Sequence, residues 1–93
     1  MSRLINLDST LIGDKYVSEP LQLEGLNAAI QIKVSEQASF VVQRSISGYD
    51  FSDIPGMTIS TADVSEVGIT GGVTGQFLRV VCTKSPISIK ALV

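Results

Sequence analysis

Residues 28–35 constrain the fold more than any other segment, because side chains of two kinds alternate there without interruption. One side of the extended chain carries Ala28, Ile30, Ile32 and Val34, and the other carries Ala29, Gln31, Lys33 and Ser35. A period of two predicts a β-strand that buries one face and exposes the other, as strands of antiparallel sheets do.

The same period returns in residues 39–46, 77–83 and 87–93, which predicts three further strands. Only three residues, the polar turn Glu36-Gln37 and then Ala38, separate residues 28–35 from residues 39–46. We therefore expect these two strands to pair side by side as a hairpin.

The alternation also predicts which side chains share a face. In residues 39–46, one side carries Phe40, Val42, Arg44 and Ile46. In residues 77–83, one side carries Leu78, Val80 and Cys82. Because Cys82 lies among apolar neighbours, we expect a buried, unreactive thiol.

Turn residues divide the rest of the chain into shorter extended segments. Pro20 interrupts residues 16–23, which predicts an edge strand or a bend because proline lacks a ladder donor. Pro55-Gly56 predicts a turn between short strands at 51–54 and 57–61, with Phe51 packed inward. Residues 64–69 are extended, and Gly71, Gly72 and Gly75 predict a loop that needs positive φ or a close chain approach.

About seven or eight strands with frequent turns predict an all-β fold, either an antiparallel β-sandwich or a small jelly roll.

The chain has 93 residues, which is room for one domain. We divide it into an N-terminal arm, residues 1–13, and a single β-sandwich domain, residues 14–93.

The spacing of the arm's apolar residues fits neither a strand nor a helix cleanly, so one or two helical turns and an extended arm both remain open. We expect the arm to clamp a partner chain, because extended segments add to a neighbour's sheet through backbone hydrogen bonds. The candidate partner-binding residues are Leu4, Ile5, Leu7 and Leu11.

The composition excludes several kinds of chemistry. The chain has no His and one Cys, so imidazole-based triads and metal sites, intrachain disulfides and zinc knuckles are ruled out. Asp50, Asp53 and Asp63 lack the spacing of a calcium loop and are interpreted as turn residues. We expect no enzymatic activity, no catalytic residue, no cofactor and no bound metal.

Charge and hydropathy narrow the range of partners. The net charge is −2 and basic runs are absent, which argues against nucleic acid. No run reaches the ~18 apolar residues that a membrane span needs. Asp8 interrupts the apolar part of the N-terminus, unlike a secretory signal peptide. We expect no membrane partner and no signal peptide.

Charged residues make up only 17% of the chain, against about 25% in an ordinary soluble domain. Ser, Thr and Gln take most of the polar positions instead. The cores of protein interfaces are likewise depleted in Lys and Glu. We infer that neighbouring chains cover much of this surface; the alternative is a Ser/Thr-rich surface on a monomer.

One aromatic residue is placed for a sugar contact. Tyr49 lies in the turn at residues 47–50, followed by Asp50, and an exposed ring with polar neighbours suits a glycan. A contact to another subunit is the other interpretation of Tyr49.

Residues 42–54, and residues 75–81 followed by 87–90, resemble hairpins and closing strands of discoidin-like and galactose-binding jelly rolls. This resemblance implies a carbohydrate-binding or adhesion module, with Tyr49 and Asp50 as candidate glycan contacts.

In size, low charge and content of Ser, Thr and Gly, the chain also resembles small all-β accessory proteins of tailed-phage virions, such as capsid decoration, auxiliary and fibre-attachment proteins. This second resemblance implies a non-enzymatic structural protein that stabilises or decorates a capsid or tail surface as an oligomer. Its partners would be other virion proteins and copies of itself. It would be made in the host cytoplasm and located in the virion. We take this as the leading hypothesis and the carbohydrate-binding module as the alternative.

Overall fold

A computed structural model describes residues 3–93 and contains ten β-strands and no helix within that range. The strands are β1 (Leu4–Asn6), β2 (Ser9–Ile12), β3 (Lys15–Ser18), β4 (Leu21–Gln22), β5 (Ala28–Lys33), β6 (Ala38–Ser45), β7 (Ser52–Thr61), β8 (Val64–Ile69), β9 (Phe77–Cys82) and β10 (Ser88–Leu92). The count exceeds the expected seven or eight because β1 and β2 form in the arm, where the sequence showed no clear period, and because the expected segment 16–23 is divided at Pro20 between β3 and β4.

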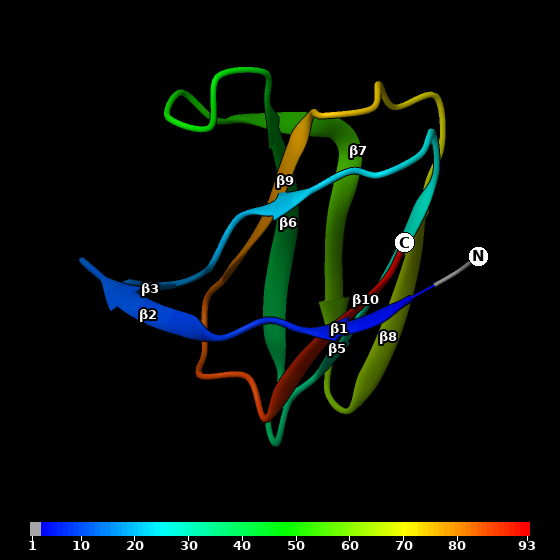
Figure 1. The fold of residues 1–93 in the computed structure, drawn as a ribbon. Helices are drawn as coiled ribbons and strands as arrows, with labels where there is room; N and C mark the ends of the chain where they lie inside the picture. Colours follow the sequence, from blue (N-terminus) through cyan, green and yellow to red (C-terminus); the bar gives the residue numbers. More distant parts are fainter. Residues whose placement is uncertain (1–2) are drawn as a thin grey trace.

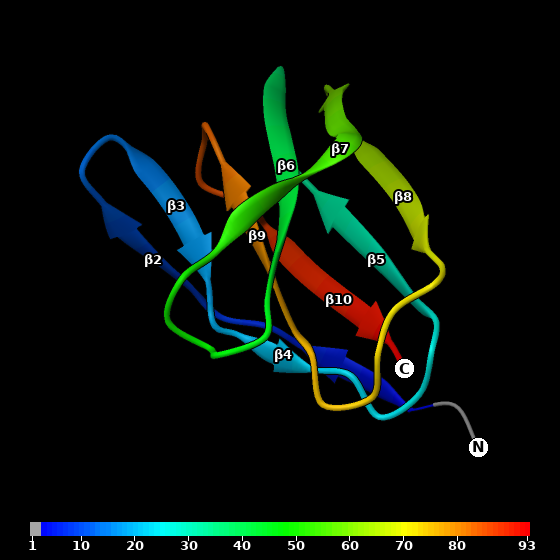
Figure 2. The same ribbon diagram turned by 90° about the horizontal axis from the view of Figure 1, so that it is seen from above.

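The strands form two antiparallel sheets that pack face to face (Figure 1). The four-stranded sheet has the order β1-β10-β5-β8. The six-stranded sheet has the order β2-β3-β9-β6-β7, and β4 pairs with β9 beside it. Figure 2 shows the two layers from above. The predicted all-β antiparallel sandwich is confirmed.

The described part of the expected arm, residues 3–13, contributes a strand to each sheet. Leu4 pairs with Leu92 of β10, whereas Leu11 pairs with Tyr16 of β3. Between them, the Leu7 N–H donates to the Ile89 carbonyl at 2.9 Å. The chain therefore crosses from one sheet to the other within a few residues. Residues 1 and 2 of the expected arm lie outside the described residues.

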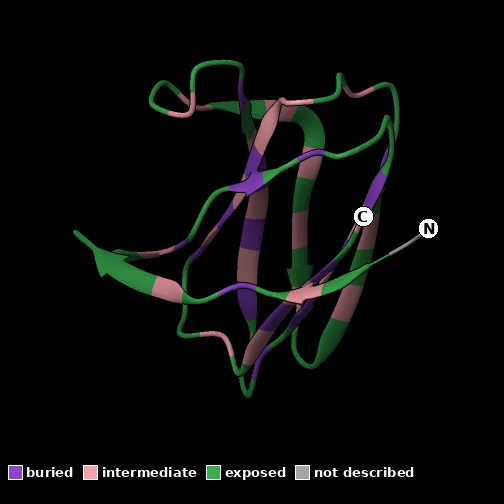
Figure 3. Ribbon diagram, in the orientation of Figure 1, coloured by how far each residue is buried: buried purple, intermediate pink, exposed green. Residues whose placement is uncertain are grey.

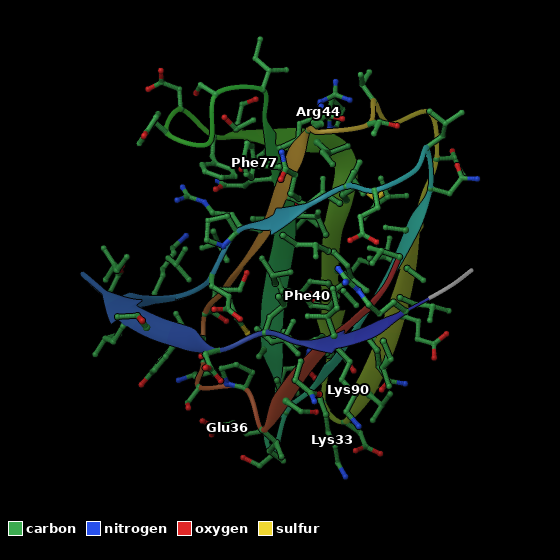
Figure 4. The ribbon with its side chains drawn as sticks, in the orientation of Figure 1. Lys33, Glu36, Phe40, Arg44, Phe77 and Lys90 are labelled. Carbon is green, nitrogen blue, oxygen red and sulfur yellow. The ribbon has the colours of Figure 1, made fainter. Side chains whose placement is uncertain are left out.

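The core fills the space between the sheets. The alternation in β5 and β9 predicted its members correctly, because Ala28, Ile30 and Ile32 are buried, as are Leu78, Val80 and Cys82. Figure 3 shows the same alternation as bands along the strands, and Figure 4 shows Phe40 in the interior. Burying each large apolar side chain stabilises the fold by about 1.5–3 kcal/mol.

The predicted hairpin between residues 28–35 and 39–46 is wrong. β5 pairs with β10 and β8 in one sheet, whereas β6 pairs with β7 and β9 in the other. Both strands turn an apolar face to the same core, so they face each other across the sandwich instead of lying side by side. A short polar connection is compatible with either arrangement, and the period of two does not distinguish them.

The predicted turn at Pro55-Gly56 is also wrong, because both residues lie inside the continuous strand β7. Val41 pairs with Thr58 and Gln43 pairs with Asp53, so residues 54–57 stand opposite the single residue Val42. Gly56, with φ of +78°, supplies the left-handed conformation that such a bulge requires.

The burial of β6 side chains departs from the expected alternation toward the end of the strand. Phe40 and Val42 are buried as expected, but Arg44 is exposed and Ser45 is buried. Ile46, expected on the side of Phe40, is 87% exposed. The expected burial therefore stops at Val42, although β6 keeps an unbroken register with β9 from Phe40 to Ser45.

Candidate partner-binding groove

An open groove of about 390 Å³ lies on the six-stranded side of the sandwich, between the β2–β3 hairpin and the loop at residues 46–51. In both Figure 1 and Figure 2, this hairpin and this loop lie on the same side of the molecule. We call the hollow the Tyr49 groove. Its lining residues are Asp8, Thr10, Ile12, Val17, Ser18, Glu19, Pro20, Gly48, Tyr49, Phe51 and Arg79.

The hairpin supplies one wall of the groove. Thr10 pairs with Val17, and the Glu19 N–H donates to the Asp8 carbonyl at 2.8 Å, which extends the ladder past the end of β3. The buried Ser18 hydroxyl accepts the N–H of Val80 at 2.8 Å and so fastens this wall to β9. Pro20, which follows Glu19, ends the pairing of the hairpin because it has no N–H to donate.

The loop at residues 46–51 supplies the opposite wall, and serine hydroxyls fix its course. Ser45 Oγ accepts the N–H of Gly48 at 3.0 Å, and Ser47 Oγ accepts the N–H of Tyr49 at 3.2 Å. Such side-chain-to-backbone bonds are the usual means by which serine shapes turns. Gly48 adopts a φ of +85° beside the Phe77 ring. The loop thus holds the Tyr49 backbone in place while the side chain stays 88% exposed.

Arg79 of β9 contributes a fixed positive charge to the groove. Its Cζ lies 4.1 Å from the centroid of the Phe51 ring, within the range of a cation–π contact. Its Nε–H donates to Gln43 Oε1 at 2.7 Å. Gln43 Nε2 in turn donates to Asp53 Oδ1 at 2.8 Å, so the arginine reaches a carboxylate through a glutamine. The expectation that Phe51 packs inward is wrong, because the ring lies under Arg79 on the outer face and outside the core.

The structure does not gather the four residues expected to bind a partner. Leu4, on the four-stranded sheet, is 62% exposed, and Leu11, at the β2–β3 hairpin, is 55% exposed. Ile5 is half-buried and packs against the core, and Leu7 is in the core of its own chain. Their role in partner binding stays a prediction.

The two residues expected to contact a glycan have different positions. Tyr49 lines the groove, whereas Asp50 is exposed beside it and does not line it. Sequence reasoning did not assign the charged residues Asp8, Glu19 and Arg79 to a site. An arginine among apolar residues of a strand was a signal for Arg79, but its position relative to Phe51 depends on chain segments far apart in the sequence.

The other groups considered for chemistry, namely possible metal ligands, Cys82 and the glycine-rich loop, do not add to the Tyr49 groove. Within residues 3–93, no group of three or more His, Cys, Asp or Glu side chains is placed to hold a metal ion. Cys82 is a free thiol with 0% exposure, as predicted. Gly71 and Gly75 have positive φ, and a Cβ on Gly72 would lie 2.6 Å from Leu23 Cδ1, which confirms the expected constraints on that loop.

Residues 3–93 contain no helix with the length and apolar character needed to cross a bilayer.

Comparisons with known proteins give a structural match only. No family model matches the chain, and no curated protein matches it either. A crystal structure of PirA matches with a TM-score of 0.50 and 8% sequence identity, over 98% of this chain and 90% of PirA. At this identity the match shows a shared fold and nothing more.

The match corrects the resemblances drawn from the sequence. The assignment to accessory proteins of tailed-phage virions, and the capsid- or tail-decorating function taken from it, are wrong: the shared fold is that of PirA, not of a phage virion protein. The partial resemblance to discoidin-like jelly rolls is likewise not retained. Low charge and abundant Ser and Thr describe a kind of surface and do not by themselves identify a function. A protein partner is consistent with these findings, but virion proteins as partners are not retained.

Proposed function

We propose that this chain is a non-enzymatic binding module that holds a segment of a partner protein in the Tyr49 groove. One observation carries the proposal: a tyrosine that is 88% exposed stands on a hydrogen-bonded loop beside an arginine fixed by a ring and a glutamine. Tyrosine and arginine are the residues that most often dominate binding energy at protein interfaces. Side chains held in place before binding lose less entropy when a partner docks.

Apolar side chains at the same end of the sandwich support an interface. Ile46 and Val73 line a second hollow of about 230 Å³ and are 87% and 64% exposed. The Gly72 N–H donates to the Leu26 carbonyl at 2.8 Å, which brings the 61%-exposed Leu26 beside Val73. Exposed apolar residues that gather in this way mark interaction surfaces more often than residues scattered singly.

The chemistry of the groove supports binding without catalysis. Its polar side chains are hydroxyls, two carboxylates and a guanidinium, and the chain has no imidazole to serve as a base near neutral pH. The thiol of Cys82 is enclosed in the core and does not line the groove. The groove therefore contains neither an imidazole nor a thiol, the groups on which nucleophilic catalysis most often depends.

Site-specific photo-crosslinking tests the proposal. A photoreactive phenylalanine at position 49 should capture a partner from an extract of the source organism. As the control, the same photoreactive phenylalanine replaces Val64, which is 45% exposed on the edge of the other sheet. The control variant should not capture this partner. The identified partner is then purified, and its affinity is measured for wild type and for Tyr49→Ala. We expect the Tyr49→Ala variant to bind about tenfold or more weakly, as at other tyrosine hot spots.

Three outcomes would overturn the proposal. One is capture of the same protein with equal yield from position 64. Another is an unchanged affinity in Tyr49→Ala. The third is Tyr49-dependent binding of a glycan on an array when no protein is captured at position 49.

A further inference from the structure

The walls of the Tyr49 groove carry opposite charges. Arg79 stands on β9 beside the loop, whereas Asp8 and Glu19 stand on the hairpin wall. The two walls of the groove therefore differ in charge as well as in shape. The inference below rests on the proposed function and names the chemistry of the segment that the groove takes.

The guanidinium of Arg79 keeps donors free for a ligand. Gln43 uses its Nε–H, and Phe51 covers one face of its plane. Within residues 3–93, its two terminal nitrogens make no hydrogen bond to a side chain, and no carboxylate forms an ion pair with it. A guanidinium held in this way offers a rigid pair of N–H groups that matches a carboxylate.

The hairpin wall offers the opposite charge. Asp8 and Glu19 are exposed, and the Glu19 carboxylate lies 3.4 Å from the Asp8 backbone nitrogen. Neither carboxylate pairs with a Lys or Arg side chain in the described part of the chain. A wholly acidic ligand would be repelled by these two groups, and a wholly basic ligand would be repelled by Arg79.

We propose that the groove binds an extended peptide segment of mixed charge, in which an acidic side chain pairs with Arg79 and a basic side chain faces Asp8 and Glu19. The apolar stems of those side chains lie against Val17, Pro20 and the Tyr49 ring, which line the same groove. Both charges of the segment are then matched across the groove, which fixes its direction as well as its composition.

NMR titration of the ¹⁵N-labelled protein tests this inference with blocked peptides. The probes are acetyl-Lys-Ala-Glu-amide and acetyl-Glu-Ala-Lys-amide, each compared with versions in which Gln replaces the Lys or the Glu. We expect one of the two mixed-charge peptides to shift the Tyr49 amide and the Arg79 Nε–H signals. We expect it to bind about tenfold more tightly than either Gln version, since each lacks one charge-assisted hydrogen bond.

Three variants assign the charges, and a fourth is the control. Arg79→Gln should remove the preference for Glu over Gln, and Arg79→Lys should restore only part of it, because lysine lacks the planar fork. Glu19→Gln should weaken the preference for Lys over Gln. Arg44→Gln removes an exposed arginine that does not line the groove and should change neither preference (Figure 4).

The outcomes separate this inference from the proposed function. Equal affinities for mixed and Gln-substituted peptides, or an unchanged Glu preference in Arg79→Gln, would overturn the inference. If the captured partner still needs Tyr49 but is insensitive to Arg79→Gln and Glu19→Gln, the inference fails and the proposed function stands. If the partner is insensitive to Tyr49→Ala as well, both fail.

Discussion

The two faces of β9 differ in how far they are buried and in whether their side chains are free to contact a partner. Leu78, Val80 and Cys82 point into the sandwich and are at most 1% exposed. Arg79 and Val81 alternate with them on the outer face and are only half-buried. The inner face packs against both sheets, whereas the outer face is covered in part by one loop and by Phe51. The comparison shows that one strand can provide stability with one face and a fixed charge for recognition with the other.

The largest effect should come from emptying the core that the inner face of β9 helps to enclose. Phe40 of β6, which pairs with Cys82 of β9, is 2% exposed in this core. Phe40→Ala leaves a cavity that the packed sheets cannot fill, so it should lower the free energy of unfolding by about 3–5 kcal/mol. Denaturant unfolding followed by circular dichroism measures the loss, with Tyr49→Ala as the exposed control, which should change stability by no more than about 0.5 kcal/mol. A loss near that of the control would show that packing in this core does not hold the fold.

A smaller effect should come from Ser18, which joins the groove wall to β9. Its buried hydroxyl accepts the Val80 N–H, and Ser18→Ala leaves that donor without a partner. We expect unfolding to become easier by about 1–3 kcal/mol. The exposed Ser35→Ala is the matched control. Equal melting temperatures for the two variants would contradict the role given to this bond.

The smallest effect on stability should come from the outer loop. Gly48 has a φ of +85°, and a Cβ there would lie 3.3 Å from Phe77 Cε2. Gly48→Ala should cost about 1–2 kcal/mol, because an L-residue resists the left-handed conformation. It should also speed hydrogen exchange at the Tyr49 amide, because the turn bonds of Ser45 and Ser47 loosen. Gly25→Ala has no atom within 4 Å of the new Cβ and serves as the control. Unchanged exchange at Tyr49 would contradict the idea that this loop fixes the tyrosine.

Prediction from the sequence worked where burial follows a local period. The alternation identified β5 and β9 and their buried faces, and it placed Cys82 in the core. It failed at the turn between β5 and β6, because pairing partners are chosen by the other strands of each sheet. It failed again at Pro55-Gly56, where a bulge opposite Val42 absorbs residues that look like a turn.

The candidate site was predictable only in part. Tyr49 could be singled out, because an aromatic residue in a Ser-Gly turn is poorly placed for burial. The contacts of Arg79 could not, since Phe51 and Gln43 come to it from another loop and another strand, and Asp53 is reached only through Gln43. The functional resemblance failed for a related reason: composition describes an average surface, whereas recognition depends on which side chains are neighbours.

The sequence by itself determined the all-β class, the buried faces of its most regular strands and the absence of imidazole chemistry, because these depend on residue type and on a period of two. The tertiary structure decided which strands became neighbours, how the N-terminal segment spans both sheets and where Arg79, Tyr49, Asp8 and Glu19 meet. The physical reason is that a backbone ladder accepts almost any strand as a partner. The choice among partners is made by the fit of all the side chains in a shared core, which no single segment contains.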